Sequence, residues 1–132
     1  MGQEFDRGSV EAMLQRVGRA LSEGHPEQIP PCWQLPAFVV SDDGARCISA
    51  AEEIENFFRQ AITWYHNQGL MATRPTLLAL QQLSPRIASV DVRWIGLDAQ
   101  GREKTNETSR YVLHRGDDGQ PRIQVAMSLS AA

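Results

Sequence analysis

Three places in the sequence carry side chains that could do acid–base chemistry. Asp42 follows a short apolar run and precedes a glycine turn, while Glu107 and Tyr111 stand four residues apart in one polar stretch. Asp91 and Arg93 alternate with apolar residues just before another turn. A carboxylate can act as a general base, and a phenol hydroxyl can donate a hydrogen bond to a reacting oxygen. Tyr111 and Asp42 are therefore the candidate catalytic residues, and Glu107 is a further polar group for the site.

No pattern in the chain indicates a metal or a cofactor. His25, His66 and His114 lie far apart and lack the spacing of a metal site. The patterns GxGxxG, GxxxxGK[ST] and GxSxG are absent from the sequence. Cys32 and Cys47 are too few for a disulfide framework. We expect no metal, no cofactor and no disulfide.

The composition is that of an ordinary globular domain. The chain has 132 residues, of which 42% are hydrophobic and 22% charged, and this length suffices for one hydrophobic core. The formal net charge of −3 argues against nucleic acid, which calls for a basic surface. The sequence has no apolar run of the roughly 18 residues that a membrane span needs. We expect one domain over residues 1–132, in a cytoplasmic protein that binds neither nucleic acid nor membrane.

Two segments have the apolar spacing of amphipathic helices. The first covers Ser9–Glu23, and a short turn at Pro26–Ile29 follows it among prolines. The second begins after Ser49, where Ser49 and Glu52 have the spacing of a capping box, and ends at Gly69. Its apolar face consists of Ile54, Phe57, Phe58, Ala61, Ile62 and Tyr65.

The remaining segments have the period of two that is typical of strands. A hairpin is predicted at 37–48, and four strands follow the second helix, at 73–83, 86–97, 103–115 and 121–129. Short turns separate these four strands, so neighbours in the sequence should pair as an antiparallel meander. The helices must then cover one face of the sheet.

The order of these elements resembles that of the NTF2-like superfamily, which includes nuclear transport factor 2, ketosteroid isomerase, scytalone dehydratase and the SnoaL-like cyclases. The resemblance rests on "ALSEGHPE", "VVSDDG" and "CISAAEEI", and on the meander sequences "VRWIGLDAQGRE" and "RYVLHRGDDGQPRI". It implies an α+β fold of the cystatin-like kind, a conical half-barrel whose curved, mostly antiparallel sheet wraps around N-terminal helices and a pocket. Members are often dimers through the outer face of the sheet. The resemblance specifies no activity.

The steroid isomerases of this superfamily hold an oxyanion with a tyrosine and an acid, and use an aspartate as base. When their element order is laid on this chain, the tyrosine falls on Val17 and the second acid near Tyr111. The base falls near Ser41, one residue from Asp42. Because a shift of one residue reverses the face of a strand, that mechanism is not carried over as it stands, and a rearranged version of it stays open.

The segment 86–97 has two faces with opposite chemistry. Val90, Val92 and Trp94 share one face, and Asp91 and Arg93 share the other. Burying a large apolar side chain gains about 1.5–3 kcal/mol. Burying a charge without a matched partner costs several kcal/mol. We therefore expect Trp94 on the helix side of the sheet, and Asp91 and Arg93 on the outer side.

The pairing of this segment with 103–115 is open at this point. A loop of four residues places Val92 opposite Glu107 and Ala88 opposite Tyr111, whereas a loop of three places Arg93 opposite Glu107. We prefer the four-residue loop, because it directs Tyr111 and Glu107 toward the pocket. The expected pocket has Asp42 near its rim and the ligand-binding residues Trp33, Phe38, Phe58, Trp94 and Glu107.

Three functions fit these expectations. The first is binding of a small hydrophobic molecule in an apolar pocket, and the second is an isomerase, dehydratase or cyclase that uses pocket acid–base residues and no cofactor. The third is a protein-interaction module that uses the sheet face. We also expect a homodimer, because Ile87, Ile95 and Leu97 give the outer face a partly apolar character.

Overall fold

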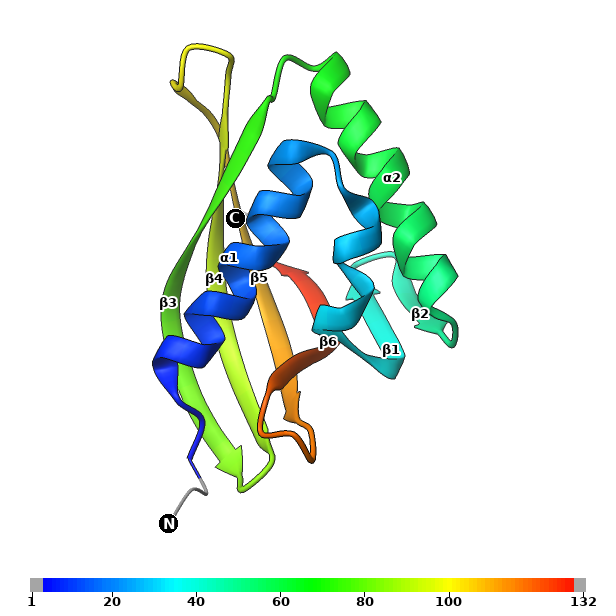
Figure 1. The fold of residues 1–132 in the computed structure, drawn as a ribbon, viewed down its shortest axis with the longest axis vertical. Helices are drawn as coiled ribbons and strands as arrows, with labels where there is room; N and C mark the ends of the chain where they lie inside the picture. Colours follow the sequence, from blue (N-terminus) through cyan, green and yellow to red (C-terminus); the bar gives the residue numbers. More distant parts are fainter. Residues whose placement is uncertain (1–3, 130–132) are drawn as a thin grey trace.

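The computed structural model describes residues 4–129, so residues 1–3 and 130–132 of the predicted domain lie outside the described part. Two helices, α1 (Arg7–Glu23) and α2 (Ala51–Asn67), lie on the concave side of a curved six-stranded sheet (Figure 1). The short turn expected after α1 consists of two 3₁₀ turns, at Pro26–Gln28 and Pro30–Cys32. The α+β half-barrel expected from the sequence is confirmed.

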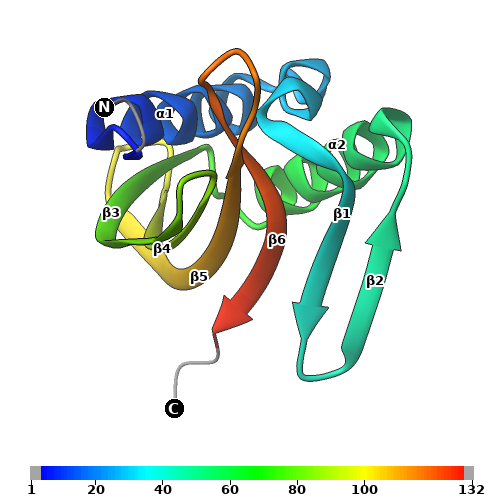
Figure 2. The same cartoon turned by 90° about the horizontal axis from the view of Figure 1, so that it is seen from below.

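The sheet has the strand order β2-β1-β6-β5-β4-β3 and is open at both edges. Its neighbouring strands are antiparallel except for β1 and β6, which run parallel. Viewed from below, the strands β3 to β6 curve around one side of α1, and β1 and β2 extend away from it (Figure 2). The strand bounds are Trp33–Ser41 (β1), Gly44–Ile48 (β2), Ala72–Ser84 (β3), Ile87–Leu97 (β4), Glu103–Arg115 (β5) and Pro121–Leu129 (β6).

Helix α1 supplies the central part of the core. It starts two residues earlier than the sequence indicated, because the Asp6 carboxylate accepts a hydrogen bond from the Gly8 amide at 3.3 Å and caps the helix. Most of the apolar stripe predicted for it is buried against the sheet, and Leu21 at its end borders a cavity. Gly18 allows a close approach, since a Cβ at this position would lie 3.1 Å from the Cδ atom of Pro75 on β3.

Helix α2 packs less closely than α1. The capping box expected for Glu52 is wrong, because Glu53 occupies that role and accepts bonds from the amide and hydroxyl of Ser49 at 3.4 and 3.3 Å. Only Ile54 and Ile62 of this helix are buried. The other apolar residues of the helix are left partly exposed, and several of them border a cavity between α2 and the sheet.

The register of β4 and β5 differs from both registers considered for the sequence. Trp94 pairs with Glu107 and Val90 with Tyr111. The connection is a five-residue loop, 98–102, in which the Asp98 carboxylate accepts hydrogen bonds from the amides of residues 100 and 102. A bulge follows, because Leu97 pairs with Glu103 whereas Gly96 pairs with Thr105, which leaves Lys104 without an opposite residue. The result is offset by two residues from the preferred register, so every side chain keeps its expected face.

The outer face of β4 carries its charged residues. Asp91 lies opposite Arg110 and accepts two hydrogen bonds from its guanidinium group, at 2.7 and 3.1 Å. The other face carries Val90 and Val92, which are fully buried, and Trp94, which approaches α1 at Gly18. Asp91 is therefore outside the cone, and Trp94 is inside it.

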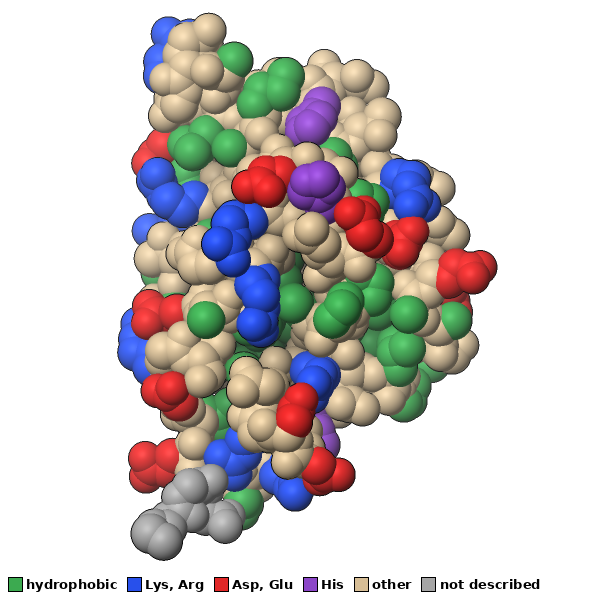
Figure 3. Space-filling model, viewed as in Figure 1, with side chains coloured by type: hydrophobic (Ala, Val, Ile, Leu, Met, Phe, Trp, Pro, Cys, Tyr) green, Lys and Arg blue, Asp and Glu red, His purple; other side chains and the backbone are tan. Residues whose placement is uncertain are grey.

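On the helix side of the molecule, the surface carries charged side chains of both signs, interspersed with exposed hydrophobic ones (Figure 3). Within residues 4–129, no helix combines the length and the apolar character needed to cross a lipid bilayer.

Candidate functional site

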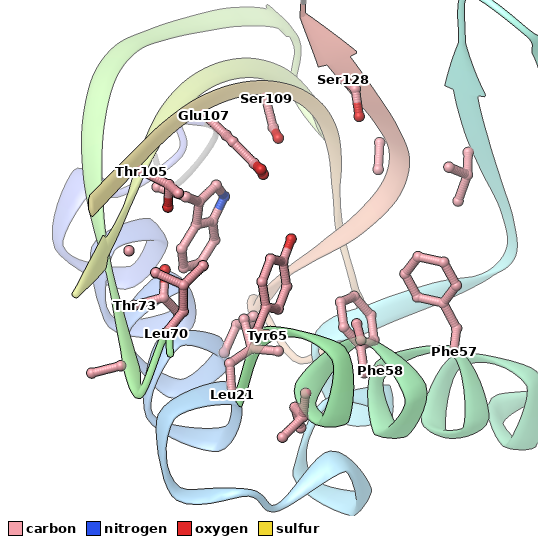
Figure 4. Close-up of a pocket in the computed structure, with 18 of the residues that line it drawn as sticks. Leu21, Phe57, Phe58, Tyr65, Leu70, Thr73, Thr105, Glu107, Ser109 and Ser128 are labelled. Atoms are coloured by element: carbon pink, nitrogen blue, oxygen red, sulfur yellow. The ribbon is translucent and has the colours of Figure 1, made fainter. Parts of the chain in front are cut away.

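The candidate site is a cavity of ≈ 230 Å³ between α2, the end of α1 and the inner face of the sheet (Figure 4). Most of its lining is apolar, and six of the chain's nine aromatic side chains contribute to it. These aromatic residues are Trp33, Phe57, Phe58, Tyr65, Trp94 and Tyr111. Phe58 contacts Trp33 and Phe57, with ring centroids 6.1 and 5.0 Å apart, so the aromatic wall is continuous there.

Five of the residues nominated from the sequence come together here. Trp33 enters from β1 and Phe58 from α2, while Trp94, Glu107 and Tyr111 come from β4 and β5. Tyr111 and Trp33 are buried in the floor, and Glu107 is exposed at the open end.

Phe38 lies outside the cavity, contrary to expectation. Along β1 the inward positions are Trp33, Ala37 and Val39, and Val39 lines the cavity. Phe38 falls on the opposite face and is 41% exposed. Phe38 pairs with Val125 of β6, whereas Val39 pairs with Ala126, which lines the cavity, so Val39 faces inward and its neighbour Phe38 faces outward.

Asp42 also lies outside the cavity. It occupies the turn that connects β1 and β2, beside Asp43, whose amide donates a hydrogen bond to the Ser41 hydroxyl at 3.3 Å. Its position in this turn removes it from the groups that could act on a molecule in the cavity.

A hydrogen bond joins two aromatic residues of the cavity. The Nε1 atom of Trp94 donates to the Tyr111 hydroxyl oxygen at 2.8 Å. Burial raises the pKa of Tyr111; hydrogen bonds with Ser109 and Trp94 act against this shift, and the nearby Tyr65 and Glu107 add to it. Tyr111 therefore keeps its proton at neutral pH and can donate it in a hydrogen bond.

Further polar side chains lie near Tyr111, two on the same strand and one on α2. Glu107 and Ser109 extend from β5 into the cavity, and the Tyr65 hydroxyl points toward them from α2 (Figure 4). Burial raises the pKa of Tyr65, and the negative charge of Glu107 raises it further. Two phenol hydroxyls, one serine hydroxyl and one carboxylate thus converge on an otherwise apolar space.

Tyr65 and Ser109 were not predicted as site residues, although the sequence contains a feature that points to each of them. Tyr65 follows Phe58 by seven residues on the apolar face of α2, and a tyrosine on such a face carries a hydroxyl that needs a partner. Ser109 lies midway between Glu107 and Tyr111, so the period of two places all three on one face of β5.

The arrangement can bind an apolar body and hydrogen-bond a polar group. Within residues 4–129, no three His, Cys, Asp or Glu side chains gather into a potential metal site. Cys32 is buried and Cys47 is exposed, and both are free thiols. The Nε1 atom of Trp33 is buried without a hydrogen-bond partner in the described chain and is not accessible from the cavity.

Comparison with known proteins agrees with this architecture. The family model described as NTF2-like protein (DUF6841) matches residues 4–131. The chain belongs to this NTF2-like family. Among curated proteins, none matches the sequence.

Solved NTF2-like structures share the fold at low sequence identity. A domain of unknown function with a cystatin-like fold from Nostoc punctiforme has a TM-score of 0.76 at 17% identity, covering 96% of this chain and 78% of that one. An NTF2-like protein of unknown function from Shewanella oneidensis has a TM-score of 0.71 at 14% identity, covering 92% and 96%. At such identities the likeness establishes the NTF2-like fold and leaves the activity to the site itself.

Proposed function

We propose that this NTF2-like protein binds a small, largely hydrophobic molecule in the cavity beneath α2. The observation that carries the proposal is an aromatic-lined space of ≈ 230 Å³ that opens to solvent at one end. An apolar cavity of ~150 Å³ in another protein already accepts benzene. One or two rings therefore fit within the space, and a third can extend through its opening to solvent. Burying the rings removes apolar area from water on both partners.

The test uses N-phenylnaphthylamine, an uncharged dye whose fluorescence rises in apolar surroundings. We expect saturable binding of one dye per chain. Ala61→Trp should abolish it, because Ala61 lines the cavity from α2 and the indole would fill the space. Ala12→Trp is the matched control, since Ala12 lies on the exposed side of α1. Absence of saturable binding, or equal binding by the two variants, would contradict the proposal.

A second candidate is an acid–base enzyme without a cofactor, such as an isomerase. It is favoured by the proximity of Glu107 and the Tyr65 hydroxyl to the Tyr111 hydroxyl in the cavity. Glu107 would remove a proton from carbon, and the Tyr111 hydroxyl would donate a hydrogen bond to the oxygen on which charge develops. Glu107 is exposed to water, and charged groups act more strongly in a site from which water is excluded. Binding therefore ranks ahead of catalysis.

The enzymatic candidate has its own test. An unsaturated cyclic ketone whose double bond is one carbon out of conjugation should be converted to the conjugated isomer, which absorbs in the ultraviolet. Glu107→Gln should remove this activity if Glu107 is the base. Purified protein that gives no more conversion than buffer alone would exclude this reaction.

A further inference from the structure

The lining of the cavity carries negative charge and no fixed positive charge among the described residues. Among residues 4–129, Glu107 is the only carboxylate in the lining, and neither a lysine nor an arginine contributes to it. Among the described lining residues, His66 in the last turn of α2 is the only side chain that can become positively charged. A ligand that enters the cavity therefore meets a negative charge at the open end, without a fixed positive charge to offset it.

Glu107 has no ion-pair partner among the described residues, which sets it apart from its neighbours. On the same strand, Glu103 pairs with Arg74 at 3.5 Å, and across the sheet Asp91 pairs with Arg110. The residue opposite Glu107 is Trp94, an aromatic residue that also lines the cavity. The carboxylate is thus placed beside aromatic rings, with its counter-charge left to the solvent or to a ligand.

Aromatic rings and a carboxylate together suit a positive charge. The face of an aromatic ring carries partial negative charge and attracts ammonium groups. The Trp94 indole N–H and the Tyr111 hydroxyl oxygen already bond to one another, so neither depends on the ligand for this contact. A neutral ligand gains from Glu107 only if it offers a hydrogen-bond donor, whereas a cation is attracted by the full charge and an anion is repelled by it.

We propose that the ligand is an amphipathic organic cation, with an apolar body in the aromatic part of the cavity and a protonated amine or quaternary ammonium group beside Glu107. This inference rests on the proposed function, because it assumes that the cavity binds an apolar molecule. Beyond the proposed function, it specifies that the molecule is positively charged and that Glu107 recognises this charge.

Three probes of one shape test the charge directly. They share a naphthylmethyl body and carry a trimethylammonium group, a tert-butyl group or a sulfonate group, so the first two differ in charge alone. Each is titrated against the N-phenylnaphthylamine complex at about pH 8, where histidine side chains are generally neutral. We expect the ammonium probe to displace the dye at about tenfold lower concentration than the tert-butyl probe, and the sulfonate to be weakest.

Glu107→Gln should remove most of the advantage of the ammonium probe over the tert-butyl probe and leave only the part due to the aromatic rings. Glu103→Gln is the matched control, because it removes the same charge from the same strand outside the cavity, and it should retain the preference. Near-ultraviolet circular dichroism establishes that both variants are folded. Equal displacement by all three probes, or an ammonium preference that is undiminished in Glu107→Gln, would overturn the inference and leave the proposed function standing. Failure of the dye itself to bind would instead overturn the proposed function.

Discussion

The indole N–H of Trp94 on β4 donates a hydrogen bond to the hydroxyl oxygen of Tyr111 on β5, at 2.8 Å inside the cone. An indole can only donate, so the tyrosine must be the acceptor in this pair. The phenol proton of Tyr111 is then directed to another acceptor, and Ser109 is close enough to hydrogen-bond with the same group. Tyr111 is therefore held in place by one side chain and able to donate to another.

Tyr111→Phe tests the strength of this contact. We expect the variant to fold and its free energy of unfolding to fall by about 1 kcal/mol, because the Trp94 N–H loses its acceptor. Urea denaturation provides the measurement. In a double-mutant cycle with Trp94→Phe, the coupling should also be about 1 kcal/mol. Additive effects of the two changes would show that the hydrogen bond does not stabilise the fold.

The two tyrosines should ionise at a higher pH in the folded protein than in the unfolded chain. Tyr65 and Tyr111 are the only tyrosines in the chain, and burial raises the pKa of both. Absorbance at the tyrosinate band should show little ionisation at about pH 10 in the folded protein, whereas the urea-unfolded chain is half ionised there. Because the folded state holds these protons more tightly, their contribution to stability is complete below about pH 10 and is lost as the pH rises further. A folded protein that titrates like the unfolded chain would contradict this.

Asp91→Asn should leave the cavity unaffected. The Asp91–Arg110 pair lies on the outer face and is partly exposed, so we expect dye affinity to be unchanged and stability to fall by less than about 1 kcal/mol. Hydrogen bonding from Arg110 lowers the pKa of Asp91. The contribution of the pair is therefore present above about pH 4 and is lost as the pH falls below that value. Loss of dye binding in an otherwise folded variant would place Asp91 in the site.

The outer sheet face leads us to expect a homodimer. Ile87 is 39% exposed there, and Ile95 and Leu97 continue the same row of β4. A partly apolar sheet face gains by being covered by a second copy. Sedimentation velocity at micromolar concentration should give the mass of two chains, and Ile87→Lys should shift it toward one. A monomer under these conditions would refute the expectation.

The sequence predicted the bounds of β5 and β6 and the inward face of β4, because burial of Val90 and Val92 outweighs any arrangement that buries Asp91. It did not predict the β4–β5 register. That register depends on the Asp98 loop and on the bulge at Lys104. The alternation of apolar residues along a strand indicates which face each side chain occupies, but not which residue lies opposite it on the next strand.

The site was predictable to the extent that it follows from strand faces. Glu107 and Tyr111 share a face in any register with the same parity, so both were placed in the cavity without the correct pairing. Phe38 was misplaced because the predicted strand began at residue 37, and its face is fixed by a pairing with β6 that is irregular between Trp33 and Phe38. The gap between α2 and the sheet depends on how closely two elements pack, which no local pattern encodes.

The bulge and loop that join β4 to β5 also restrict how this protein can change length during evolution. The polar groups of the cavity on β5 occupy alternate positions, Thr105, Glu107, Ser109 and Tyr111. If one residue were lost from this connection and β5 shifted by one position along β4, these positions would turn outward and Asn106, Thr108 and Arg110 would enter the cone. Insertions and deletions here should therefore survive in relatives mainly in steps of two residues, or together with a gained or lost bulge.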